Sequence, residues 1–224
     1  MKIPRKAARA PQRAFTLIEL MVVVALLGII AMLAAPSMFE IIGMQRLRAI
    51  NSQLVTDIQY LRGEAVSRNQ YMGFVARSVS TEPMSCYVIY SHSLSPLNPD
   101  ALLPGDTQCN CTNAVGSVCS GNFRELRTVQ IPRDVSIDLR FPPNQGGRVV
   151  ANPISGGIDI KPPNSALFDD LEFCIEIRRT PRGRLRTSVN LAGRTSACSP
   201  DGSVPGVPVC PPYDSTIKNC QAAS

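Results

Sequence analysis

The sequence Ala14-Phe15-Thr16-Leu17-Ile18-Glu19-Leu20-Met21-Val22-Val23-Val24 opens the apolar segment that decides the architecture of this chain. Between Phe15 and Ala35 the only charged residue is Glu19. As a helix this segment would be about 31 Å long, which matches the hydrocarbon core of a bilayer. A charged side chain at the bilayer centre costs about 3 kcal/mol on insertion scales, and less near the interface. The carboxylate of Glu19 therefore requires a specific reason.

The residues before this segment set its orientation. Met1–Ala14 contains five basic residues and no acid, and without them the formal charge falls from +6 to +1. Basic residues stay on the cytoplasmic side, so the rest of the chain is expected to cross the inner membrane and lie in the periplasm. A secretory signal peptide fits less well, because the apolar run is too long and ends without an A-x-A site. A plain signal anchor would explain the basic residues and the apolar run, but not the charge at Glu19.

The cysteines give independent support for export. There are eight, and all lie after residue 85. An even number confined to this part predicts disulfides in an oxidising compartment, although eight cysteines allow 105 connectivities. The candidates are Cys86, Cys109, Cys111, Cys119, Cys174, Cys198, Cys210 and Cys220.

Position along the chain suggests which cysteines pair. The first four could form two bridges in one loop, Cys174 and Cys198 flank a strand hairpin, and Cys210 with Cys220 would close a small C-terminal loop. Zinc is disfavoured because the usual C-x₂₋₄-C spacing is absent.

The segment Ala14–Glu19 resembles the class III signal of type IV pilins and pseudopilins, and Gly28 and Pro36 fall where that family places its helix-softening residues. The resemblance implies cleavage between Ala14 and Phe15 by a prepilin peptidase and N-methylation of Phe15. It also implies that Glu19 meets the N-terminal amine of a neighbouring subunit. Ala14 replaces the usual glycine before the cut.

Beyond Pro36 the pattern is amphipathic. The charged residues of this part lie outside its apolar stripe: Arg46, Arg48, Asp57, Arg62 and Glu64. We predict one helix from Phe15 to Arg68, the alternative being two helices broken at Pro36. The stripe has the three-and-four spacing of a helix and consists of Leu47, Ile50, Leu54, Ile58, Leu61 and Ala65.

After Asn69 the period changes to two, which predicts half-buried antiparallel strands covered by the helix. The fold class is therefore α+β, a long N-terminal helix on an antiparallel sheet, as in the pilin fold. The turn signal Thr180–Gly183 joins the last two clear strands into a hairpin. The clear strands are Val135–Phe141, Leu171–Arg178 and Leu185–Leu191, and the weaker ones are Met72–Ala76, Tyr87–Tyr90 and Val129–Ile131.

These patterns divide the chain into consecutive parts. Residues 91–122 are rich in Ser, Pro, Asn, Gly and Cys and are expected to be an exposed, disulfide-stapled loop. The parts are a leader (1–14), a transmembrane helix (15–35), its amphipathic continuation (36–68), a β-sheet domain (69–198) and a Pro/Gly-rich tail (199–224).

Two later segments extend the resemblance to the FimT/FimU/GspH branch of minor pilins. Leu61–Asn69 is similar to the "L-x-x-A-R-S-E-A-x-x-R-N" stretch of that branch, and Leu191–Arg194 with Cys198 is similar to its closing "G-R…C" strand. The loop 91–122 and the tail match nothing in that branch.

Catalysis finds little support in the sequence. His92 is the only histidine, it lies in a Ser/Pro-rich stretch, and no nucleophile and base are placed to act together. We expect no enzymatic activity, no cofactor and no metal.

An arginine cluster offers a nucleic-acid alternative. Residues 178–194 carry six arginines and no acid, including Arg182, Arg184, Arg186 and Arg194. Some FimT-like relatives bind DNA through "G-R-x-R" in the final strand region. Here Gly183–Arg186 has those letters but lies earlier, whereas Gly193-Arg194 lies in place without a second arginine. The alternative is a solvated or subunit-contacting basic edge.

The sequence thus predicts a minor pilin subunit of a type IV pilus that primes or caps filament assembly. The alternatives are a type II secretion pseudopilin and a DNA-binding minor pilin for transformation. The expected partners are the prepilin peptidase, other minor and major pilins or pseudopilins, the inner membrane and, for the third alternative, DNA. The expected final location is a pilus or pseudopilus.

Overall fold

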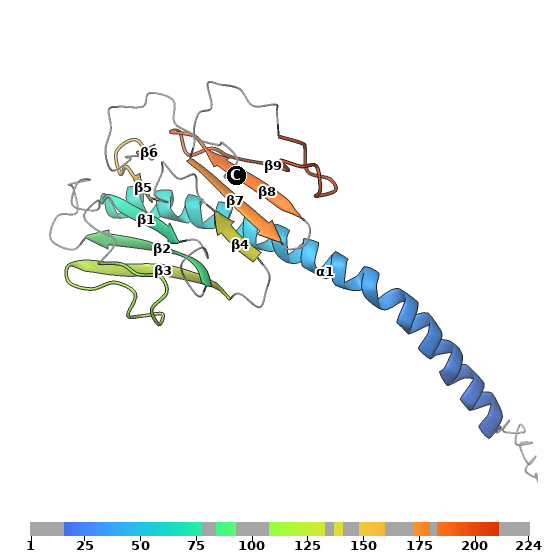
Figure 1. The fold of residues 1–224 in the computed structure, drawn as a ribbon. Coiled ribbons are helices and arrows are strands. Elements are labelled where there is room, and N and C mark those ends of the chain that lie inside the picture. Colours follow the sequence, from blue (N-terminus) through green and yellow to red (C-terminus); the bar gives the residue numbers. More distant parts are fainter. Residues whose placement is uncertain are drawn as a thin grey trace, which may run out of the picture. The chain divides into compact units, whose positions relative to one another are not determined.

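The structure is a computed structural model that describes residues 16–77, 84–92, 108–132, 137–140, 148–159, 173–179 and 183–210. The chain divides into two compact units, Met1–Ile42 and Gly43–Ser224, which are described separately below. Figure 1 shows one helix followed by strands throughout the second unit.

Helix α1 spans Leu17–Arg68, 52 residues. The Thr16 hydroxyl accepts a hydrogen bond from the Glu19 backbone N–H at 3.3 Å, so Thr16 is the N-cap. At the other end, Asn69 has a φ of 50°. The Gln70 N–H donates to the Ala65 carbonyl at 3.0 Å and the Asn69 N–H to the Val66 carbonyl at 3.2 Å, a Schellman ending.

Helix α1 begins at Leu17, and helical backbone continues through Pro36. The stretches on either side of this proline, Leu17–Leu33 and Met38–Arg68, form a bent pair. A proline inside a helix removes one backbone hydrogen bond but need not end the helix.

The strands form two sheets rather than the expected single sheet. The five-stranded sheet has the order β3-β2-β1-β5-β6, the four-stranded sheet has the order β4-β7-β8-β9, and neighbouring strands run antiparallel. The bounds are β1 Met72–Arg77, β2 Met84–His92, β3 Phe123–Pro132, β4 Ile137–Arg140, β5 Arg148–Ala151, β6 Ile158–Asp159, β7 Phe173–Arg179, β8 Arg184–Val189 and β9 Thr195–Cys198.

All six predicted strands are present, and β9 falls in the segment that the resemblance gave as a closing strand. β5 and β6 were missed, because they are four and two residues long, too few for a period of two to be recognised. The hairpin of β7 and β8 is confirmed, with the Arg179 N–H donating to the Gly183 carbonyl at 2.8 Å across the turn.

The main core lies between α1 and both sheets of the second unit. The predicted stripe is confirmed by five residues that are each at most 1% exposed: Leu47, Leu54, Ile58, Leu61 and Ala65. They pack against residues of both sheets and of the C-terminal segment, among them Phe74, Tyr87, Ile89, Val149, Ile177, Leu185, Val189 and Val204.

A second cluster covers the outer face of the five-stranded sheet. Cys109, Cys111 and Val118 are buried there against Val88 and Val150. The expectation that the stapled loop is exposed is therefore wrong for this part. With α1 on one face and the loop on the other, β1 and β2 are buried on both faces and lack clean alternation.

Three disulfides are formed within the described residues: Cys86–Cys111, Cys109–Cys119 and Cys198–Cys210. The first two give the two bridges expected in the stapled loop. The pairings Cys174–Cys198 and Cys210–Cys220 are wrong, because Cys198 is bonded to Cys210.

Sheet geometry explains this correction. β8 lies between β7 and β9, so Cys174 and Cys198 are two strand spacings apart, about 9–10 Å, too far for a disulfide. The Cys210 N–H donates to the Ser199 carbonyl at 3.0 Å, which brings Cys198 and Cys210 to a Cα–Cα distance of 4.9 Å. Cys220 and the Cys174 side chain lie outside the described part.

Candidate functional site

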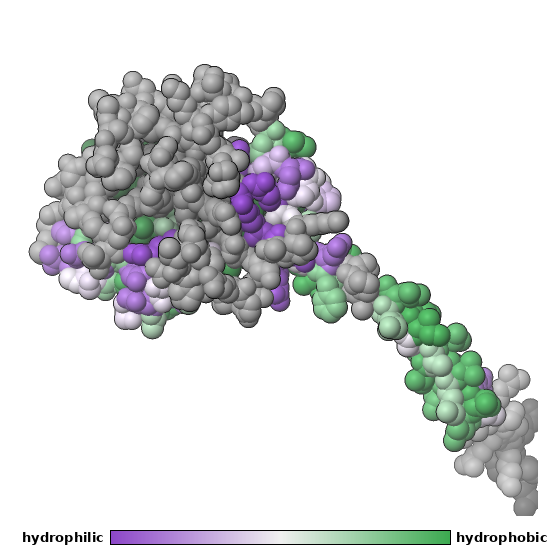
Figure 2. Space-filling model, in the orientation of Figure 1, coloured by the Kyte–Doolittle hydropathy of each residue, from purple (hydrophilic) through white to green (hydrophobic). Residues whose placement is uncertain are grey.

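The N-terminal stretch of α1 presents apolar side chains on all sides. Every described side chain from Thr16 to Leu33 is exposed, for example Leu17 at 76% and Met32 at 82%. Figure 2 shows this apolar surface along the helix. An apolar surface of this extent marks an interaction site, because a helix that is hydrophobic all round is stable only when lipid or other helices cover it.

Within the described residues, no single helix is both long and apolar enough to span a membrane. The helical stretches Leu17–Leu33 and Met38–Arg68 pass that test only when taken together as a broken pair.

Glu19 has a local structural role as well as the predicted one in assembly. Thr16 at the N-cap and Glu19 three residues later have the sequence of a capping box, and Thr16 accepts the Glu19 N–H. A carboxylate in the first turn is also favoured by the helix dipole. The Glu19 side chain is exposed and remains open to a partner.

The other predicted processing and hinge residues have little structural description. Ala14 and Phe15 lie outside the described residues, and so does the Pro36 side chain. At Gly28 an added Cβ would meet nothing within 4 Å, so packing within this chain does not require a glycine there.

The two later segments of the resemblance meet in space, although they are far apart in sequence. Arg62 donates from Nη1 to the Gly193 carbonyl at 3.2 Å and from Nε to the Gly156 carbonyl at 2.6 Å. Gln59 donates to the same Gly193 oxygen at 3.0 Å. α1 is thus tied to the β5–β6 turn and the β8–β9 turn, one from each sheet.

Gly193 is required by this contact. Its φ is 71°, and an added Cβ would overlap the Arg62 side chain. The glycine of the Gly193-Arg194 pair is therefore explained by its contact with Arg62. The Arg194 side chain, by contrast, is exposed.

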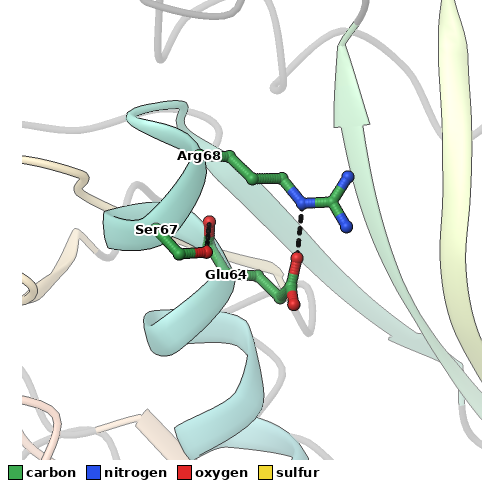
Figure 3. Close-up of polar contacts among 3 residues, drawn as sticks. All are labelled: Glu64, Ser67 and Arg68. Carbon is green, nitrogen blue, oxygen red and sulfur yellow. Dashed lines mark hydrogen bonds and ion pairs between the residues drawn. The ribbon is translucent and has the colours of Figure 1, made fainter.

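The rest of the segment Leu61–Asn69 completes the end of the helix. Glu64 and Arg68 form an ion pair one turn apart, and the Ser67 hydroxyl donates to the Glu64 carbonyl at 3.2 Å (Figure 3). Ala65 is fully buried, and Asn69 supplies the left-handed residue of the ending. This segment therefore holds the helix in place.

The arginine cluster is only partly brought together. Arg184 and Arg186 alternate with the buried Leu185, and Arg178 pairs with Arg184, so these three arginines share the outer face of the four-stranded sheet. Arg194 lies in the turn after β8, at the other end of that strand. Arg182 lies outside the described residues.

The backbone register pairs two of these arginines with acidic residues of neighbouring strands. Glu176 is the partner of Arg186, and Asp138 is the partner of Arg178. Arg179 belongs to the opposite face, where it lies against Gly43 of α1.

A buried polar trio was missed by the sequence reading. Asp57 is fully buried, although it was placed off the apolar stripe. The Tyr87 hydroxyl donates to its Oδ2 at 2.7 Å, and the Arg127 Nε lies 2.9 Å from its Oδ1. Spacings of three from Leu54 and four from Leu61 could have signalled that Asp57 faces the core.

Burial, together with the hydrogen bond to Asp57, raises the pKa of Tyr87 well above its usual range. The trio lies between helix and sheet, where it joins α1 to β2 and to β3. We assign it to the packing of the domain.

The described residues contain no group of three or more His, Cys, Asp or Glu side chains arranged to hold a metal. His92 lies edge-on to Phe123, with ring centroids 4.9 Å apart.

Comparison with known proteins gives one family match. Residues 9–35 match the Prokaryotic N-terminal methylation motif. No curated protein matches the chain.

Two solved structures are similar, both of the type IV minor pilin FimU of Pseudomonas aeruginosa in different crystal forms. One is 17% identical and covers 73% of this chain and 95% of its own, with a TM-score of 0.41. The other is 16% identical and covers 71% of this chain and 98% of its own, with a TM-score of 0.39. The motif match agrees with the resemblance seen at Ala14–Glu19: the N-terminal segment of this chain carries a prokaryotic N-terminal methylation motif.

Proposed function

We propose that this chain is a minor pilin of a type IV pilus that primes or caps filament assembly. In this proposal the precursor is held in the inner membrane with its N-terminus in the cytoplasm. A prepilin peptidase cuts between Ala14 and Phe15, Phe15 is methylated, and the subunit then joins other pilins. The observation that carries the proposal is the methylation motif at residues 9–35, followed directly by a helix exposed and apolar on all sides.

The two parts of α1 support an assembly role. The part from Leu17 to Leu33 needs partners to cover it, whereas the part from Leu47 to Ala65 is already covered by its own sheets. A subunit of this kind can bury its first part among equivalent helices of neighbouring subunits while displaying a folded domain. Before assembly, lipid would cover the same surface.

A deletion strain tests the proposal. Loss of surface pili and twitching with normal protein secretion would support a type IV pilus subunit. Normal pili with secreted proteins retained in the cell would contradict it and favour the alternative, a pseudopilin of a type II secretion system. Mass spectrometry of the mature chain would check cleavage, since the proposal requires an N-terminal methyl-phenylalanine at Phe15.

We further propose that the charge of Glu19 pairs with the N-terminal amine of a neighbouring subunit. In a site of low dielectric this pairing would offset the cost of burying the carboxylate and fix the subunit register. Because Glu19 also stands at the third position of a capping box, a plain alanine variant cannot separate the two roles.

Three variants separate them. Glu19→Gln keeps a residue suited to the capping box but removes the charge, and it should fail to enter filaments, as should Glu19→Ala. Thr16→Ala removes the cap, at a cost of about 1 kcal/mol of helix stability, and should still assemble. Assembly of Glu19→Gln at the normal level, measured by immunoblot of sheared filaments, would show that capping is the role of Glu19.

DNA binding is the second candidate function, and the observation in its favour is the shared face of Arg178, Arg184 and Arg186. The test replaces Arg184, Arg186 and Arg194 together with glutamine. Loss of DNA uptake with pili intact would support this function, and unchanged uptake would exclude it.

A further inference from the structure

Within the part of the chain that the structure describes, β3 has no hydrogen-bonded strand on its outer side, although the Phe123 N–H donates to the Ser120 carbonyl at 3.3 Å. β3 is the terminal strand of its sheet, with β2 as its hydrogen-bonded neighbour (Figure 1). A terminal strand presents unpaired backbone N–H and C=O groups along one side, and these can pair with another extended chain.

A hollow of about 520 Å³ lies beside the start of this strand. Its lining includes the four consecutive residues Phe123–Leu126, together with Val115, Gly116 and Cys119 of the stapled loop. Successive side chains of a strand point to opposite faces. A hollow that touches four residues in a row therefore runs along the side of the strand rather than over one face.

The far wall of the hollow is held in place. The Glu125 Oε2 accepts the backbone N–H groups of Gly116 at 2.9 Å and Val118 at 3.3 Å. The Cys109–Cys119 disulfide closes the same loop. A wall fixed in this way lowers the ordering cost of binding a ligand.

Two charged residues of opposite sign line the hollow, Arg124 and Glu125. The carboxylate of Glu125 is occupied by the loop amides and by the Thr128 hydroxyl at 2.6 Å. Further along the strand, Arg127 is paired with the buried Asp57. The Arg124 side chain is exposed, and no described residue forms an ion pair or hydrogen bond with its guanidinium.

We propose that the start of β3 binds an extended acidic segment of a partner protein. The segment adds a strand beside Phe123–Leu126 and places a carboxylate at Arg124. Backbone pairing supplies affinity, and the carboxylate supplies selectivity by charge complementarity. A second copy of β3 offers no free carboxylate to Arg124, because its Glu125 is held by the loop amides and the Thr128 hydroxyl. The bulge at Leu126 confines the added strand to the start of β3.

The test uses the full chain in detergent and three fluorescein-labelled, capped heptapeptides. The first alternates valine and threonine around a central glutamate, the second carries glutamine in place of the glutamate, and the third is the first with alternate backbone amides N-methylated. Binding is measured by fluorescence anisotropy. The glutamate peptide should bind about threefold to fivefold more tightly than the glutamine peptide, the range expected for one exposed ion pair. The N-methylated peptide should not bind, because it cannot complete the ladder.

Two variants locate the site. Arg124→Glu should reverse the preference, so that the glutamine peptide binds more tightly than the glutamate peptide. The control Arg194→Glu makes the same charge change at an exposed arginine outside the hollow, and it should leave the preference unchanged.

Four results would overturn the proposal: no binding of the glutamate peptide, equal binding of the glutamate and glutamine peptides, undiminished binding of the N-methylated peptide, or an unchanged preference in Arg124→Glu. Sedimentation of the wild type without peptide would detect the competing occupant, because self-association lost in Arg124→Glu would assign this edge to a second copy. The experiment does not depend on the filament role, so its failure would leave the proposed function standing.

Discussion

Helix α1 contains two stretches that differ in composition and in exposure. From Leu17 to Leu33 every side chain is exposed, whereas from Leu47 to Ala65 the apolar residues are among the most buried of the chain. The first stretch is apolar on all sides, and the second has apolar residues only at helical spacing. The apolar face of the second stretch is therefore covered by the sheets of its own domain. The first stretch needs other molecules to cover it.

The largest expected difference between the two stretches comes from deleting one leucine in each. Leu54→Ala should lower the free energy of unfolding of the sheet domain by about 2–5 kcal/mol, because the side chain is fully buried in the main core. Leu26→Ala, at a residue 56% exposed, should change it by less than about 0.5 kcal/mol.

Urea unfolding of the full chain in detergent, followed by circular dichroism, measures both values. In the cell we expect the reverse order, with Leu26→Ala reducing incorporation into filaments without reducing the amount of folded protein. Equal destabilisation by the two variants would mean that the first stretch is also part of the domain fold.

The contact of Arg62 with Gly193 should give the next largest effect. Gly193→Ala combines a positive φ with overlap on the Arg62 side chain, and we expect a loss of about 2–4 kcal/mol. Gly206→Ala is a matched control, because its φ is 75° but an added Cβ meets nothing within 4 Å, and it should cost about 1 kcal/mol.

Thermal unfolding of the two glycine variants gives the comparison. A similar loss in both would show that backbone strain alone is responsible and that the Arg62 contact adds little to the docking of the helix.

The buried trio of Asp57, Tyr87 and Arg127 predicts sensitivity to alkaline pH. The raised pKa of Tyr87 means that the unfolded chain releases the phenolic proton above about pH 10 while the folded chain keeps it. Rising pH therefore favours unfolding, by up to about 1.4 kcal/mol per pH unit from this group.

Urea midpoints between pH 8 and pH 11 test this for the wild type and Tyr87→Phe. The variant should be less stable at pH 8, because the hydrogen bond to Asp57 is lost. It should also lose less stability than the wild type between pH 10 and pH 11. Parallel curves over that interval would show that Tyr87 titrates normally.

The smallest effect is expected at the surface pair of Glu64 and Arg68. This pair spans one helical turn, and the Arg68 side chain is 49% exposed, so Glu64→Gln should cost no more than about 0.5 kcal/mol. The difference from the wild type should vanish in about 1 M salt, where the Debye length is about 3 Å. A larger loss that persists at high salt would mean that Glu64 has a further role in ending the helix.

Local pattern predicted much of this architecture. The apolar run, the helical spacing from Leu47 to Ala65 and the alternation in β7 and β8 each follow from side-chain periodicity, which is a property of the sequence alone. The N-cap at Thr16 was not predicted, although its hydrogen-bond partner lies only three residues away.

Other features depended on residues distant in sequence. The sheet register paired Arg178 with Arg184 and so brought these two arginines together. The position of β8 between β7 and β9 excluded a Cys174–Cys198 bond, and the turn around Ser199 brought Cys198 to Cys210. None of these contacts leaves a periodic pattern in the sequence of the segments that form it.

The sequence by itself determined that the chain has a basic N-terminal stretch, an apolar helix with one carboxylate, an amphipathic continuation and a domain of strands that contains all the cysteines. Tertiary structure decided that the domain has two sheets, that Asp57 is buried, that the stapled loop covers a sheet face, and that Arg62 meets Gly193. The physical reason is that composition and periodicity act within a few residues, whereas register, pairing and burial are fixed only when distant segments compete for the same core.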